Sequence, residues 1–185
     1  MKLINISKKY DDKTIFCNLN FECKNNDFVV ITGKSGVGKT TFLNILSGLT
    51  DFVGQVDFQG NISYMLQQDV FVENLNVFDN LILTTQKSEQ EIVEMFSKLQ
   101  IENILSQFPD ELSGGLKRRV SLVRALLKDS DILLLDEPTK SLDDETAMQV
   151  VDLIQNDYEK KKRLTFCVTH NAQLFENIAT KMLNF

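Results

Sequence analysis

Residues 33–40 read GKSGVGKT, a glycine-rich segment that matches the pattern G-x-x-x-x-G-K-[ST]. It follows a short apolar run at 28–32 and precedes a stretch, 40–49, whose apolar residues recur at intervals of three and four, as on the buried face of a helix. In the order strand, turn, helix, the backbone N–H groups of the turn point at phosphate oxygens, and the helix directs its positive end at the same anion. The segment therefore predicts a nucleoside triphosphate site in an α/β fold.

This segment and the residue after it supply the predicted nucleotide ligands. We expect the Lys39 ammonium to reach the β- and γ-phosphates and to stabilise charge in the transition state. The Thr40 hydroxyl is expected to bind Mg²⁺, and the Thr41 hydroxyl to donate a hydrogen bond to the α-phosphate. The full set is Gly33, Lys34, Ser35, Gly36, Val37, Gly38, Lys39, Thr40 and Thr41.

Two adjacent carboxylates follow a second apolar run. Residues 131–137 read DILLLDE, which is typical of a buried parallel strand with acidic residues at its C-terminal end. We expect Asp136 to hold Mg²⁺, directly or through water, and Glu137 to polarise the attacking water as general base. Two neighbouring carboxylates raise each other's pKa, which favours proton acceptance by one of them.

Composition narrows the classes of protein to which the chain can belong. The chain has 185 residues, of which 43% are hydrophobic and 25% charged, as expected of one globular domain rather than a disordered chain. No apolar run approaches the ~20 residues of a membrane span, and MKLINISKKY lacks the apolar region of a signal peptide, so a cytosolic location is expected. The net charge of −6 argues against nucleic acid as a partner. Three cysteines and one histidine do not suggest a zinc site.

Along the chain, strand-like and helix-like segments alternate, which favours a parallel α/β sheet. The segment from about 70 to 128 is richer in helix-forming patterns and is interpreted as an inserted helical lobe. Strands are predicted at 2–6, 15–23, 28–32, 55–58, 62–66, 131–135, 164–169 and the terminal KMLNF, and helices at 40–49, 86–100, 116–128, 145–162 and briefly after 172.

A third motif resembles the signature of one family. LSGGLKRRVSLVRALL at 112–127 is similar to the LSGGQ motif of ATP-binding cassette (ABC) transporter subunits, and it precedes the DILLLDEP strand as in that family. The resemblance implies that Ser113, Gly114 and Gly115 bind the γ-phosphate of an ATP held by a partner subunit. Leu116 departs from the Gln or Glu usual at that position, which removes one polar contact.

The same resemblance implies roles for residues outside these motifs. Tyr10 corresponds to the aromatic residue that stacks on adenine, and Asp143 to the loop that crosses to the partner subunit. Gln67 is expected to sense Mg²⁺ and the γ-phosphate, although Gln68 follows it and an assignment one residue later stays open. His170, the only histidine, corresponds to the switch histidine at the γ-phosphate.

The implied fold is α/β, a P-loop NTPase core of the ABC ATPase type with a small antiparallel β region and an inserted helical subdomain at about 70–128. The whole chain, 1–185, would form this single domain. The implied cofactors are ATP and Mg²⁺.

The implied function is ATP hydrolysis by a head-to-tail homodimer that encloses two ATP–Mg²⁺. It would drive export of a peptide, lipid-like or drug substrate through separate integral membrane subunits, at the inner face of the cell membrane. The alternative is a cassette ATPase without a transport role, in cluster assembly, cell division or DNA maintenance.

Overall fold

Two sheets organise the chain, and the computed structural model describes all of residues 1–185. The smaller sheet is antiparallel, in the order β2-β1-β4. The first two strands were predicted at 2–6 and 15–23, but they are longer because they pair as a hairpin that brings Tyr10 opposite Lys13. The strands are β1 (Lys2–Tyr10), β2 (Lys13–Glu22) and β4 (Val53–Asp57).

The larger sheet has five strands in the order β5-β6-β7-β3-β8, and every pair of neighbours is parallel. β6 and β7 are buried along their whole length, which explains their nearly unbroken apolar sequences. The C-terminal ends of parallel strands meet at one edge of a sheet, where ligands bind in open α/β folds. The strands are β3 (Phe28–Thr32), β5 (Ile62–Met65), β6 (Ile132–Asp136), β7 (Leu164–Val168) and β8 (Lys181–Asn184).

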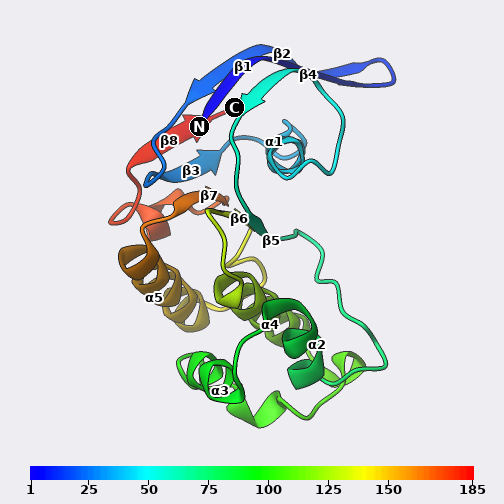
Figure 1. The fold of residues 1–185 in the computed structure, drawn as a ribbon, viewed down its shortest axis with the longest axis vertical. Coiled ribbons are helices and arrows are strands. Elements are labelled where there is room, and N and C mark those ends of the chain that lie inside the picture. Colours follow the sequence, from blue (N-terminus) through cyan, green and yellow to red (C-terminus); the bar gives the residue numbers. More distant parts are fainter.

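One hydrophobic core lies between the two sheets. It is built from α1 (Lys39–Leu46), the antiparallel sheet and one face of the parallel sheet (Figure 1). The first helix was predicted over 40–49 but ends at Leu46, and Gly48 then adopts a φ of 73°. A positive φ is the usual way for glycine to end a helix.

A larger core covers the opposite face of the parallel sheet and continues into a helical lobe (Figure 1). α2 and α3 lie farthest from the antiparallel sheet, within the span predicted for the insert. The helices are α2 (Val77–Thr85), α3 (Glu89–Ser97), α4 (Gly114–Leu127) and α5 (Asp144–Lys161), with short 3₁₀ turns at Glu102–Ile104, Pro109–Glu111 and Ala172–Phe175.

The helical lobe differs from its predicted outline. The single helix expected at 86–100 is the shorter α3, because Ser88 and Glu91 form a capping box that fixes its first turn, and α2 precedes it as a separate helix. The helix expected at 116–128 begins two residues earlier, after the Ser113 side chain has accepted a hydrogen bond from the Leu116 amide. The segment after 172 is a 3₁₀ turn.

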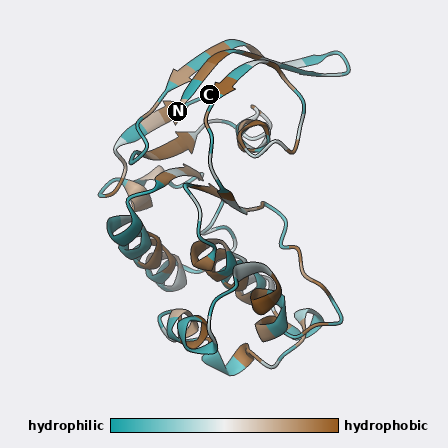
Figure 2. Cartoon of the chain, in the orientation of Figure 1, coloured by the Kyte–Doolittle hydropathy of each residue, from teal (hydrophilic) through white to brown (hydrophobic).

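Hydropathy follows this layering. Figure 2 shows hydrophobic residues on the strands of the parallel sheet and hydrophilic ones on the outer side of α5. None of the helices combines the length and the apolar character needed to cross a bilayer.

Candidate nucleotide site

The loop between β3 and α1 forms a tight curl at the C-terminal edge of the parallel sheet. Gly33 and Gly38 have φ values of 140° and 119°. A Cβ at Gly33 would lie 2.7 Å from the Phe185 carbonyl oxygen, and one at Gly38 would lie 2.5 Å from Cγ2 of Ile15. Only glycine fits both the backbone conformation and the space at these two positions.

Lys39 closes this curl from inside. Its ammonium donates hydrogen bonds to the carbonyl oxygens of Gly33 (2.8 Å) and Lys34 (3.1 Å). Lys39 is only 6% exposed and is the first residue of α1. Its positive charge and the N-terminus of the helix therefore lie together at the glycine-rich loop. Both features favour a bound anion.

Asp136 ends β6 as a fully buried carboxylate whose two oxygens have no hydrogen-bond partner in the protein. Burial raises its pKa, while the Thr40 hydroxyl and the positive charges of Arg118 and Lys39 act in the opposite direction. A buried carboxylate without a partner is costly unless a cation offsets its charge. Carboxylate and hydroxyl oxygens are the donors that Mg²⁺ prefers, so Asp136 and Thr40 fit a magnesium site.

Glu137 and His170 follow the ends of the neighbouring strands β6 and β7 and meet at this edge. The Glu137 carboxylate, 3.0 Å from the His170 Nε2, belongs to a residue that is only 7% exposed. Burial raises the Glu137 pKa and the Asp136 charge adds to this, whereas His170 lowers it. A carboxylate with a raised pKa accepts a proton more readily, as a general base must.

A cavity of about 410 Å³ joins these elements. It runs from the β1–β2 hairpin across the glycine-rich loop to the ends of β6 and β7. Its lining residues are Tyr10, Lys13, Ile15, Ser35, Gly36, Gly38, Lys39, Thr40, Thr41, Gln67, Glu137, Val168 and His170. Most of the residues singled out in the sequence are therefore brought together, and Gln67 lines the cavity whereas Gln68 does not.

Tyr10 is held at the rim of this cavity. Its hydroxyl lies 3.5 Å from the Thr50 hydroxyl, and the Lys8 ammonium lies 4.5 Å from its ring centroid. The residue is 44% exposed, so its ring keeps surface on which a flat group can stack.

The signature residues lie apart from the cavity. Ser113, Gly114 and Gly115 open α4, Asp143 caps α5 by accepting a hydrogen bond from the Thr146 amide at 2.9 Å, and none of the four lines the cavity. A Cβ on Gly115 would lie 3.4 Å from Leu142, so the loop before α5 packs against the start of α4. Gly33, Lys34, Val37 and Asp136 also do not line the cavity, although they belong to the loop or to the strand end that borders it.

Four residues of this region were not predicted from the sequence: Lys13, Ile15, Val168 and Arg118. Lys13 and Ile15 enter the cavity because the hairpin folds over the loop, and the Lys13 ammonium lies 3.4 Å from the Gly36 carbonyl oxygen. Arg118 lies on α4 yet donates hydrogen bonds to the carbonyl oxygens of Asp136, which ends β6, and of Glu137, which follows it. The only sequence signal was the basic KRR run after the signature glycines.

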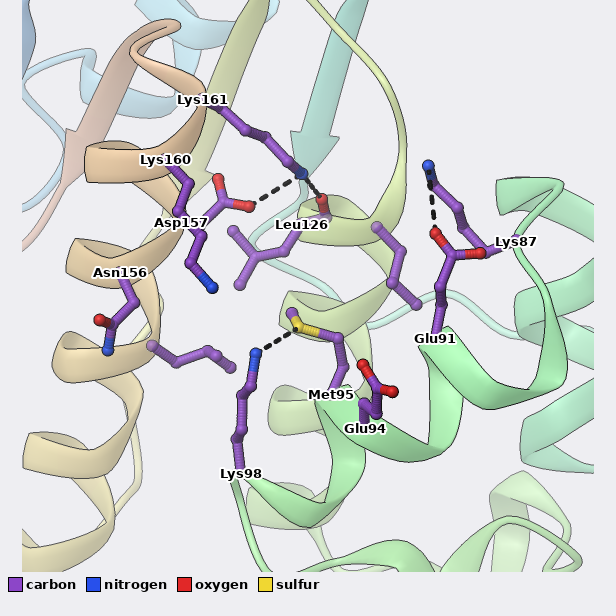
Figure 3. A pocket seen from close by; sticks show the side chains of 12 residues that line it. Lys87, Glu91, Glu94, Met95, Lys98, Leu126, Asn156, Asp157, Lys160 and Lys161 are labelled. Atoms are coloured by element: carbon purple, nitrogen blue, oxygen red, sulfur yellow. Dashed lines mark hydrogen bonds and ion pairs between the residues drawn. The ribbon is translucent and has the colours of Figure 1, made fainter.

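A second cavity, of about 210 Å³, lies away from this edge (Figure 3). It is bounded by α3, the C-terminal end of α4 and α5, and both acidic and lysine side chains line it. It belongs to the contact between the helical lobe and α5, and none of the predicted site residues reaches it.

The family model described as "ABC transporter" matches residues 16–140, well over half of the chain. The chain is 32% identical over 199 residues to the Staphylococcus epidermidis protein named "Putative hemin import ATP-binding protein HrtA", covering 92% of this chain and 90% of that protein.

Solved structures agree with this family. The dimeric post-hydrolysis structure of the ATP-binding cassette MJ0796 with ADP and Pi superposes with a TM-score of 0.85 at 25% identity, over 100% of this chain and 93% of that one. An archaeal ribosome recycling factor, aABCE1, superposes with a TM-score of 0.86 at 26% identity, although this chain spans only 36% of its length. The chain belongs to the ABC transporter family, as one of its ATP-binding and ATP-hydrolysing subunits.

Proposed function

We propose that two copies of this chain form a head-to-tail dimer around two ATP–Mg²⁺ and drive transport through separate membrane subunits. The observation that carries the proposal is the convergence of Lys39, Asp136, Glu137 and His170 on one edge of the parallel sheet, beside a cavity that the phosphate loop lines.

Each residue of the site has a separate role in ATP binding or hydrolysis. Lys39 and the amides of the glycine-rich loop bind the β- and γ-phosphates, and Tyr10 stacks on the adenine. Glu137 accepts the proton of the attacking water, and His170, 3.0 Å from its carboxylate, orients that carboxylate at the γ-phosphate. Thr40, Asp136 and Gln67 would hold Mg²⁺, which would neutralise part of the phosphate charge.

The start of α4 supports the dimer. Its helix N-terminus is exposed at Gly114, and a helix N-terminus favours a phosphate. Because Ser113, Gly114 and Gly115 do not face their own cavity, the phosphate that they bind belongs to a second copy. A two-fold axis then places the same pair of contacts at both sites.

The helical lobe supports a membrane partner. Large apolar side chains are exposed on the segment after Gln67, on α2 and beside the second 3₁₀ turn, and exposed apolar surface of this kind marks interaction sites. They are Val70, Val72, Ile82, Leu83 and Phe108, between 41% and 64% exposed. We place the membrane subunits on this surface, which we name the lobe surface, at the inner face of the cell membrane.

The proposed substrate is a peptide, a lipid-like molecule or a drug, moved by export. The staphylococcal relative is named for hemin import, so hemin is the first small molecule to test, and the direction of transport is part of that test.

We expect the tagged chain to co-purify with a multi-spanning protein, in stoichiometric amount, from gently solubilised membranes of its native cell. Leu83→Asp should abolish this co-purification, because the substitution places a negative charge on the lobe surface. Val53→Asp is the matched control, since Val53 is 72% exposed on the antiparallel sheet, far from the lobe. Soluble partners alone would favour the cassette ATPase without a transport role.

A further inference from the structure

One buried guanidinium joins three segments of the site. Arg118, one turn into α4, is 4% exposed and does not line the nucleotide cavity. Arginine offers five N–H donors in a rigid fork, and here all three nitrogens are used. The acceptors are the carbonyl oxygens of Glu137 (3.1 Å from Nε and 3.0 Å from Nη2), Asp136, Leu66 (2.8 Å) and Gln67 (3.2 Å), and a carboxylate oxygen of Asp69 (3.0 Å).

The first group of acceptors is the backbone that carries the proposed general base. Glu137 has a φ of 58°, a conformation that side-chain-bearing residues rarely adopt and that persists only where the surroundings enforce it. Its amide donates to the Val168 carbonyl at 2.9 Å, and its carbonyl accepts the two bonds from Arg118. The peptide units on both sides of this residue are therefore fixed, and the carboxylate is aimed at His170.

The second group of acceptors is the loop that carries Gln67. Arg118 holds the carbonyl of Gln67 itself and that of the preceding residue, and the Asp69 carboxylate anchors the far end of the loop. The cavity-lining side chains of Gln67 and Glu137 thus share one positively charged support, which lies one helical turn after the signature glycines.

We infer that Arg118 is a positioning residue that sets Glu137 and Gln67 relative to the start of α4, so that engagement of the signature residues is coupled to hydrolysis. The inference rests on the proposed roles of Glu137 and the signature. It assigns Arg118 no contact with the nucleotide, so its loss should lower kcat and leave ATP affinity nearly intact.

The experiment measures kcat, KM and ATP affinity for Arg118→Lys and Arg118→Gln. Lysine keeps the charge but has no planar fork and cannot reach all the acceptors. We expect kcat to fall about 10- to 100-fold, the size of effect that a misplaced catalytic group produces, and ATP affinity to change less than about threefold. Arg118→Gln should lower kcat at least as far, because glutamine lacks both the charge and the fork.

Arg163→Lys is the matched control. Arg163 is also a buried guanidinium, 5% exposed, and it bonds to Asp157, Ser130 and the carbonyl oxygen of Lys128 near the opposite end of the strands. We expect both substitutions to lower Tm, but only Arg118→Lys to lower kcat. An equal fall of kcat in the control would show that Arg118 contributes only to the stability of the fold, and would overturn the inference. A rise in KM with unchanged kcat in Arg118→Lys would also overturn it.

Asp69→Asn keeps the inference testable if the Arg118 variants do not fold. It weakens one anchor of the guanidinium without touching the cavity, and we expect a smaller fall in kcat at unchanged ATP affinity; unchanged kcat would count against the inference.

The proposed function is tested separately, because a wild-type chain without ATPase activity, or a Glu137→Gln variant that hydrolyses ATP at the wild-type rate, contradicts that function itself. Wild-type activity in Arg118→Lys, with Glu137→Gln inactive, contradicts only the role of Arg118.

Discussion

At the scale of single residues, the site contains two buried carboxylates whose burial is electrostatically unfavourable. Asp136 is fully buried without a hydrogen-bond partner, and burial raises the pKa of both Asp136 and Glu137. Neither arrangement stabilises the nucleotide-free protein. Natural sites commonly give up stability in this way where a ligand or a reaction needs the charge.

We therefore expect Asp136→Asn to unfold at a higher temperature than wild type at pH 7 without nucleotide. The native carboxyl has a pKa above its ordinary value of 3.8 and binds its proton more tightly than the unfolded chain does. Wild-type stability is thus greatest below that ordinary value and falls as pH rises through the raised pKa, so the advantage of the variant should shrink towards pH 3.8.

Thermal unfolding as a function of pH measures this, with Asp152→Asn on the exposed side of α5 as the control. With ATP and Mg²⁺ the order should reverse, because the ligand stabilises the wild type more. A variant that is less stable at every pH would contradict the electrostatic account of Asp136.

At the scale of elements, a buried ion network ties the end of α5 to the end of α4. The Asp157 carboxylate accepts a hydrogen bond from Arg163 and forms an ion pair with Lys161, both at 2.8 Å. Lys161 also donates to the carbonyl oxygen of Leu126, the last turn of α4 (Figure 3). These bonds join the two helices and give the carbonyl of Leu126, in the last turn of α4, a hydrogen-bond donor.

Asp157→Asn should lower the free energy of unfolding by about 3–5 kcal/mol, because it leaves the buried Arg163 guanidinium without a counter-charge. Glu159→Gln lies on the exposed side of the same helix and should change stability by less than about 0.5 kcal/mol. Denaturant unfolding monitored by circular dichroism measures both. Equal small losses would show that the network adds nothing beyond an exposed ion pair.

At the scale of the whole molecule, the proposed dimer depends on surfaces that one chain leaves open. A Cβ at Gly114 meets no atom within 4 Å, so a side chain there fits the monomer and projects from the start of α4. The same position would face the phosphates of the partner's ATP in the head-to-tail arrangement.

We expect Glu137→Gln to bind ATP without hydrolysing it, and to elute as a dimer with ATP and as a monomer without it. Adding Gly114→Glu should abolish the dimer through charge repulsion with the phosphates, while each monomer still binds ATP. Ser97→Arg, at the exposed end of α3, is the control and should leave the dimer intact. Size-exclusion chromatography with light scattering measures the mass, and an ATP-dependent dimer that tolerates Gly114→Glu would contradict this geometry.

The sequence by itself determined the glycine-rich loop, the acidic end of β6 and the positions of the parallel strands along the chain. These features are contiguous in the chain: glycines set the local curl, and an apolar run bounded by polar residues marks a buried strand. The family followed from the same motifs. The predicted roles of the individual site residues remain predictions that the cavity supports.

Only the tertiary structure decided the features that depend on contacts between segments far apart in the sequence. Pairing with β2 extended β1 to Tyr10, and the fold of the loop turned Gln67 rather than Gln68 into the cavity. The contacts of Arg118 reach across about 50 positions of sequence to Leu66 and Gln67. Local pattern cannot predict such contacts, because they form only when separate elements have packed and each buried donor must find an acceptor.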